Sequence, residues 1–198
     1  MHPSRRLLVG LLALAIVWTL PSLACVPCCA PCANLGPAGP VSPCGQIAVS
    51  REAALRLESK VSTLKGDVFQ LTVSDEELTS WIALKLPEFQ AANPDLPKIP
   101  VVNPQACFSG GKVYVTGKLT DPVEAPFALV ASVRVEGNLV RFTIESGSLG
   151  PLPMPKDVLD SLGKSVEDTL NDPSVGIRFT KIQVMDRAVL VEGRIQRP

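Results

Sequence analysis

The part of the chain that decides the fold is residues 112–155, KVYVTGKLTDPVEAPFALVASVRVEGNLVRFTIESGSLGPLPMP. Apolar and polar residues alternate over residues 112–119, 127–135 and 140–144, which is the period of strands with one buried face. Gly137 and Asn138 separate the last two of these segments, and both residue types tolerate the positive φ that a two-residue hairpin turn requires. The last two segments are therefore predicted to form a β-hairpin.

The turn and the apolar pattern of this hairpin predict the same strand register. The predicted pairs are Val135 with Val140, Val133 with Phe142, and Ala131 with Ile144. All six side chains share one face, and a slip by one residue would turn all of one strand to the other face. On the polar face this register sets Arg134 opposite Arg141, a repulsion that Glu136 and Glu145 can offset.

Length and charge limit the class of protein. After an N-terminal segment, the 198-residue chain leaves room for one domain of roughly 150 residues, which is large enough to bury a core. The 19 basic and 19 acidic residues give no net charge, so no basic face predicts nucleic-acid binding. The only histidine is His2, in the N-terminal segment, which excludes His-dependent triads and dyads from the predicted domain.

Residues 1–24 predict a signal peptide or a membrane anchor. Arg5 and Arg6 precede the uncharged residues 7–20, and the next basic residue is Arg51, so the positive-inside rule places the rest of the chain outside the cytoplasm. Three forms stay open: cleavage with release, a retained span, and lipidation of Cys25. Leu23, Ala24 and Cys25 are similar to a bacterial lipoprotein box, from which Ser22 departs. We expect a domain held at the extracytoplasmic side of the cell membrane.

Residues 25–46 are rich in cysteine and proline and are predicted to be an extended tether. The C-x-x-C-C-x-x-C spacing over residues 25–32 is one that zinc and redox proteins use. No histidine or second ligand pair accompanies it, so neither a metal nor another cofactor is predicted. Cys107, in a predicted strand, is interpreted as a small buried apolar residue.

Residues 47–198 are predicted to form the folded domain. We expect helices over residues 50–65, from 74 to 86 and over 155–170, a loop over 87–100, and hairpins over 106–119 and 177–195. Ser74 and Glu77 have the spacing of a capping box, and a bulge is expected near Thr180 and Lys181. Sequential antiparallel strands with helices on one face indicate the α+β class.

A weak internal repeat supports this layout. Residues 112–118 (KVYVTGK) match residues 188–194 (AVLVEGR) in pattern. Each segment is the return strand of a predicted hairpin that follows a helix.

The predicted domain contains no complete catalytic motif. Ser161 and Lys164 fit S-x-x-K, the nucleophile motif of penicillin-recognising enzymes, but the partner motifs are absent. Asp157, Asp160, Glu167 and Asp168 on the same helix are interpreted as a solvated face and not as metal ligands. We therefore expect a protein that is not an enzyme.

Four short segments carry a resemblance to a family. They are FQLTVSDEEL (residues 69–78), GKVYVTG (111–117), VRVEGNLVRF (133–142) and GPLPMP (150–155). In this order the chain resembles the YpmS-like membrane-anchored bacterial proteins and, more distantly, the LmeA-like extracytoplasmic phospholipid-binding proteins. The resemblance implies a strongly curved antiparallel sheet of hairpins that wraps amphipathic helices, related to the tubular lipid-binding folds and containing an apolar groove. The chain departs from the family in its cysteine-rich tether and at Asp186 and Arg187, where the family tends to have a glycine turn.

The expected function is non-catalytic binding of a lipid or another apolar ligand by a membrane-attached domain. Leu149, Leu152 and Met154 alternate with prolines and glycine in a stiffened loop that we expect to expose them. The candidate groove residues are Trp81, Val113, Val115, Phe127, Leu129, Val133, Phe142, Ile144, Leu149, Leu152 and Met154. One alternative is a cell-envelope interaction module without a ligand groove, and another is a redox or metal protein that uses the Cys25–Cys32 cluster. The sequence predicts no particular ligand and no protein partner.

Overall fold

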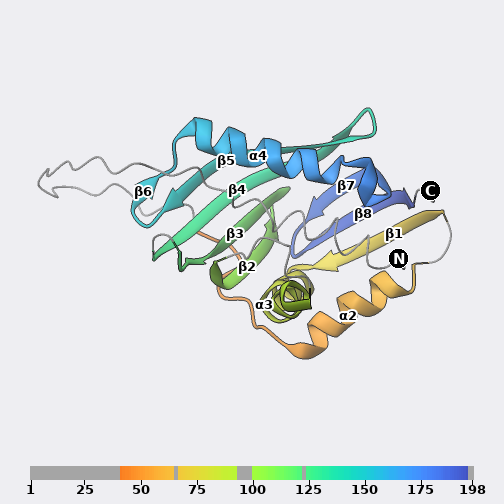
Figure 1. Cartoon of the computed structure of the whole chain (residues 1–198), viewed down its shortest axis with the longest axis horizontal. Helices are drawn as coiled ribbons and strands as arrows, with labels where there is room; N and C mark the ends of the chain where they lie inside the picture. Colours follow the sequence, from red (N-terminus) through yellow and green to blue (C-terminus); the bar gives the residue numbers. More distant parts are fainter. Residues whose placement is uncertain (1–40, 65–66, 93–99, 122–123, 196–198) are drawn as a thin grey trace, which may run out of the picture.

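The computed structural model describes residues 41–64, 67–92, 100–121 and 124–195, which form helices and two antiparallel sheets (Figure 1). The elements in chain order are α2 (Arg51–Ser62), β1 (Val68–Ser74), α3 (Asp75–Ala92), β2 (Val101–Ser109), β3 (Lys112–Leu119), β4 (Ala125–Glu136), β5 (Leu139–Leu149), β6 (Leu152–Pro153), α4 (Lys156–Leu170), the 3-10 helix η1 (Pro173–Val175), β7 (Ile177–Met185) and β8 (Ala188–Ile195). One sheet has the order β1-β8-β7 and the other β2-β3-β4-β5-β6. The predicted α+β class is confirmed.

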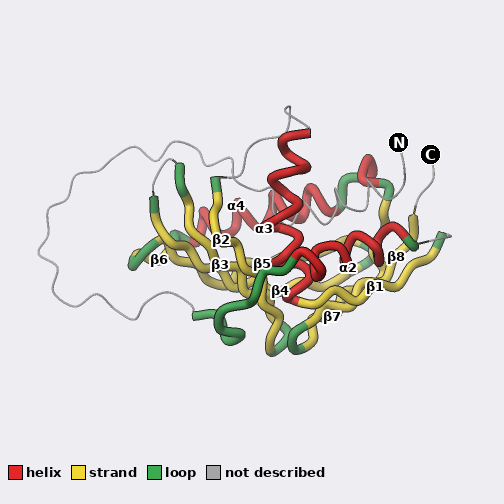
Figure 2. Tube along the Cα trace, turned by 90° about the horizontal axis from the view of Figure 1, so that it is seen from below, coloured by secondary structure: helices red, strands yellow, loops and turns green. Residues whose placement is uncertain are grey.

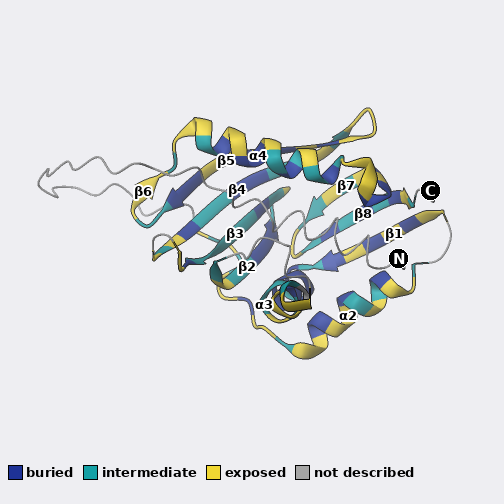
Figure 3. Ribbon diagram, viewed as in Figure 1, coloured by how far each residue is buried: buried dark blue, intermediate teal, exposed yellow. Residues whose placement is uncertain are grey.

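The two sheets form one curved layer with the helices on its concave side (Figure 2). The sheets approach each other where β4 lies beside β7. Buried side chains from both sheets and from α2, α3 and α4 form one continuous apolar cluster. In Figure 3 the outward side of α4 is exposed, whereas the side that faces the sheet is buried. The core therefore fills the concave side of the layer.

The central hairpin has the predicted register. Val135 pairs with Val140, Val133 with Phe142, Ala131 with Ile144, and Arg134 with Arg141. Glu136 contacts both arginines, at 2.6 Å from Arg134 Nε and 3.8 Å from Arg141 Nε, whereas Glu145 forms an ion pair with Lys112 instead. Beyond Ala131 the register shifts by a β-bulge, so that the first part of β4 pairs with residues 146–149. This bulge curves the sheet.

Helix α4 covers the exposed edge of β5. Glu167 Oε1 accepts a hydrogen bond from the backbone N–H of Phe142 at 2.8 Å. The Asn171 amide donates to the carbonyl of Val140 and accepts from its N–H, at 2.9 and 2.7 Å. A Cβ on Gly163 would lie 3.0 Å from the Phe142 carbonyl oxygen, so glycine lets the helix approach the strand. The interpretation of Glu167 as part of a solvated face is therefore wrong, because its carboxylate satisfies a strand edge.

Polar contacts at its start fix α3 in place. Ser74 and Glu77 form the predicted capping box, with both hydrogen bonds at 3.1 Å. Thr79 Oγ1 accepts from the N–H of Ala106 at 2.9 Å and donates to its carbonyl at 3.2 Å, which joins the helix to β2. Ser80 Oγ accepts from the N–H of Ser50, the N-cap of α2. Thr79 and Ser80 are fully buried, so each hydroxyl is used within the core.

The internal repeat has a structural counterpart. In β3, Gly117 lies opposite Phe127, and in β8, Gly193 lies opposite Phe69. A Cβ on either glycine would come within 3 Å of the facing phenylalanine ring. In both sheets the glycine thus leaves space for the aromatic ring of the neighbouring strand.

Arg187 joins the tips of two hairpins. It has a φ of 66°, which is the left-handed region, at the turn between β7 and β8. Its N–H donates to the carbonyl of Phe108 at 2.8 Å, and its carbonyl accepts from the N–H of Asp75 at 3.1 Å. The guanidinium Nε lies 3.0 Å from Oδ2 of the buried Asp75, although the geometry is that of an ion pair and not of a hydrogen bond. Arg187 therefore supplies a positive charge at the turn between β7 and β8.

The burial of Asp75 predicts a pH dependence of stability. Burial raises the pKa of its carboxyl group above the ordinary 3.8, against the opposing effect of Arg187. An acid whose pKa is raised on folding binds its proton more tightly in the folded state, so its ionisation disfavours folding above that pKa. As pH falls from 7 toward 4, wild-type protein should gain stability relative to Asp75→Asn. Urea unfolding of both proteins across this range measures their free energies of unfolding, and a wild type that loses stability relative to Asp75→Asn as pH falls would contradict the assignment.

Two predicted boundaries are wrong. Helix α3 continues through Pro87 to Ala92, where a loop was expected from residue 87. Strand β2 begins at Val101 and not near Ala106, because a register shift between Val102 and Gln105 accommodates Pro104 within the strand.

Within the described ranges, no helix is long and apolar enough to cross a membrane.

Candidate functional site

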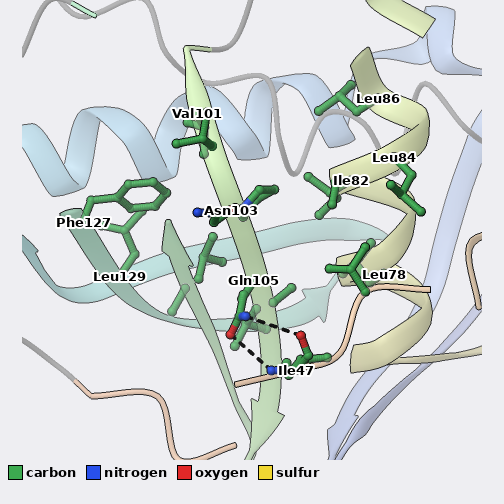
Figure 4. A pocket seen from close by; sticks show the side chains of 18 of the residues that line it. Ile47, Leu78, Ile82, Leu84, Leu86, Val101, Asn103, Gln105, Phe127 and Leu129 are labelled. Carbon is green, nitrogen blue, oxygen red and sulfur yellow. Dashed lines mark hydrogen bonds between the residues drawn. The ribbon is translucent and has the colours of Figure 1, made fainter. Parts of the chain in front are cut away.

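A pocket of about 1010 Å³ lies on the concave side of the five-stranded sheet, between it and the helices (Figure 4). Strands β2 to β5 supply its base, and one side of α3 supplies a wall. The described lining residues are mostly apolar, and Leu78, Ile82, Phe127, Leu129 and Ile144 are among them. The size is at the top of the range of about 300–1,000 Å³ that is usual for small-molecule pockets.

Residues 46–49, here called the strap, close one side of the pocket. Ile47 is 4% exposed, whereas Ala48 and Val49, which follow it on the way to α2, are exposed. The side chain of Gln105 accepts from the N–H of Ile47 and donates to its carbonyl, both at 3.4 Å (Figure 4). The amide of Gln105 thus pairs with the strap as a neighbouring strand would.

A disulfide between Cys44 and Cys107 holds the strap from its other end. The two Cα atoms are 5.9 Å apart, and the bond joins Cys44, just ahead of the strap, to the middle of β2. Cys107 is buried, as expected, and the disulfide to Cys44 was not predicted. Cys44 lies within the predicted tether over residues 25–46, and the disulfide bonds this part of it to β2.

The structure brings together six of the eleven candidate groove residues. These six line the pocket: Val113, Val115, Phe127, Leu129, Phe142 and Ile144. Trp81 is 2% exposed and belongs to the core, and Val133 packs against that core without lining the pocket.

Leu149, Leu152 and Met154 do not form the expected exposed patch. Leu149 ends β5 and pairs with Leu152 of the short strand β6. Met154 packs against the core, and its sulfur lies near Gly147, where a Cβ would be 3.2 Å away. Only Leu152 is well exposed, at 65%. The two residues of β6 pair with the end of β5 as an edge strand, a position in which proline is tolerated.

Several residues that shape the pocket have no signal in the sequence pattern. Gln105 and the strap lie far apart in the chain, and the register shift that places Asn103 in the lining occurs between the predicted loop over residues 87–100 and the predicted hairpin over 106–119. Even cysteine usage is a weak signal, because Cys44 is one of five cysteines before the domain and any of them can pair with Cys107.

The described residues contain no group of three or more His, Cys, Asp or Glu side chains placed to hold a metal ion. Ser161 and Lys164 of the S-x-x-K motif are both exposed, and Lys164 forms an ion pair with Asp168 at 2.9 Å. Cys25 and the cluster over residues 25–32 lie outside the described residues.

Comparisons of the chain with protein-family models, with curated proteins and with solved structures find no match. The resemblance to the YpmS-like and LmeA-like proteins stays a prediction.

Proposed function

We propose that this domain binds a lipid or another apolar ligand, without catalysis, while attached to the extracytoplasmic side of a cell membrane through its N-terminus. The pocket of about 1010 Å³ carries this proposal. A volume of this size with an apolar lining is the setting in which long-chain ligands lose contact with water, and that loss is the main driving force of their binding.

The Cys44–Cys107 disulfide supports the proposed location outside the cytoplasm. Disulfides form and persist mainly outside the cytoplasm, where the environment is oxidising. The leader predicted over residues 1–24 agrees with that location.

A variant that fills the pocket tests the proposal. Val115→Trp places a large ring in the lining, whereas Thr116→Trp changes the next residue of β3, which does not line the pocket. We expect Val115→Trp to weaken binding of the neutral probe Nile red at least tenfold and to reduce the lipid that co-purifies with the full-length protein, measured by mass spectrometry. Thr116→Trp should change neither quantity.

Equal probe binding by both variants, with melting temperatures near that of the wild type, would show that the pocket is not the binding site. The interaction-module alternative would then gain.

A further inference from the structure

The lining of the pocket carries no ionisable side chain among the described residues. Its polar side chains are four amides: Gln46, Gln90, Asn103 and Gln105. A carboxylate or phosphate drawn into such a lining would lose its water and gain no counter-charge, which costs far more than the transfer of an uncharged polar group. The lining therefore suits the uncharged part of a ligand.

Pro87 adds a hydrogen-bond acceptor to the same wall. It lies inside α3 and has no N–H, so the carbonyl of Ala83, four residues earlier, lacks its usual helical partner. Ala83 and Pro87 both line the pocket. A proline in a helix interior costs about 3 kcal/mol, so its position at the pocket wall is consistent with a role in binding. A carbonyl that lacks its helical donor, in an apolar wall, favours a ligand that brings a donor.

We infer that the ligand, on the proposed function, is an uncharged acyl lipid with a free hydroxyl, of the diacylglycerol class. The hydroxyl donates to the carbonyl of Ala83, and the side-chain amide of Asn103 donates to an ester carbonyl. Size agrees with this class. A methylene group is comparable with a water molecule, whose share of liquid volume is about 30 Å³, so two eight-carbon chains take up roughly 500 Å³. The pocket, at about 1010 Å³, holds such a lipid with room for longer chains.

Three lipids with the same two octanoyl chains test this assignment on delipidated full-length protein. They are dioctanoylglycerol, its phosphate ester, and its acetate ester, and each is measured by displacement of Nile red at pH 7.5. We expect the phosphate to bind at least tenfold more weakly than the free alcohol, because its charge has no partner in the lining. The acetate should bind several-fold more weakly, since it lacks the donor but stays uncharged.

A helix-repairing variant tests the role of Ala83. Pro87→Ala restores the N–H that pairs with the Ala83 carbonyl, so it should stabilise the protein and yet remove the preference for the alcohol over the acetate. Pro155→Ala, at the start of α4 and outside the pocket lining, is the matched control and should keep that preference. A rise in melting temperature confirms that a loss of preference does not come from misfolding.

The outcomes test the ligand class, the role of the Ala83 carbonyl and the proposed function separately. Equal or tighter binding of the phosphate would overturn the inference while leaving the proposed function in place. A preference for the alcohol that survives in Pro87→Ala would overturn the role of the Ala83 carbonyl. Failure of all three lipids to displace the probe would overturn the inference, and failure of Nile red itself to bind would overturn the proposed function as well.

Discussion

Replacing both Cys44 and Cys107 with serine is expected to lower the free energy of unfolding by about 4 kcal/mol. The bond closes a loop with a sequence separation of 63, and the entropy that such a loop removes from the unfolded chain corresponds to about this value. The double change avoids leaving one unpaired thiol in the core. Urea unfolding under oxidising conditions measures the loss.

Cys28→Ser is the control for this prediction, because it removes a cysteine and leaves the Cys44–Cys107 pair intact. Its unfolding curve should match that of the wild type. If the double variant also matches the wild type, the bond does not stabilise the folded domain. A strong reductant should reproduce the double variant's loss in the wild type and add little to the variant itself.

The second large effect is expected at Phe142. Its side chain is 6% exposed, so Phe142→Ala should cost about 3–5 kcal/mol as a large-to-small change in the core. Thr143→Ala alters the next residue of β5, on the exposed face, and should be nearly neutral. Chemical unfolding of the two variants gives the comparison. Similar losses at both positions would mean that the strand does not bury the face assigned to it.

Local patterns were sufficient where neighbours in sequence are also neighbours in space. The Gly137–Asn138 turn and six alternating apolar residues determine the register of the central hairpin, since only one register puts all six on one side. The capping box at Ser74 and the bulge after Phe179 are set over a few residues in the same way.

The site itself depends on contacts that no local pattern encodes. The strap meets Gln105 across 58 residues, and the disulfide pairs two cysteines that the sequence leaves among several choices. Pro87 has the signature of a helix end, yet α3 runs past it to Ala92, since tertiary packing can override local propensity. Alternation identified six residues of the five-stranded sheet that line the pocket, although Val133 does not line it. Residues 149–154 lie outside the lining, because Leu149 and Leu152 pair at the edge of the sheet.

The Cys44–Cys107 bond also determines how the domain would bear mechanical force. A pull applied through the residues before Cys44 would pass along the covalent bond directly into β2, which is hydrogen-bonded to β3. The loop between the two cysteines contains the strap, α2, β1 and α3, and it lies outside this line of tension. A domain pulled through the residues before Cys44 would therefore keep the α3 wall of its pocket unstretched until β2 separated from β3.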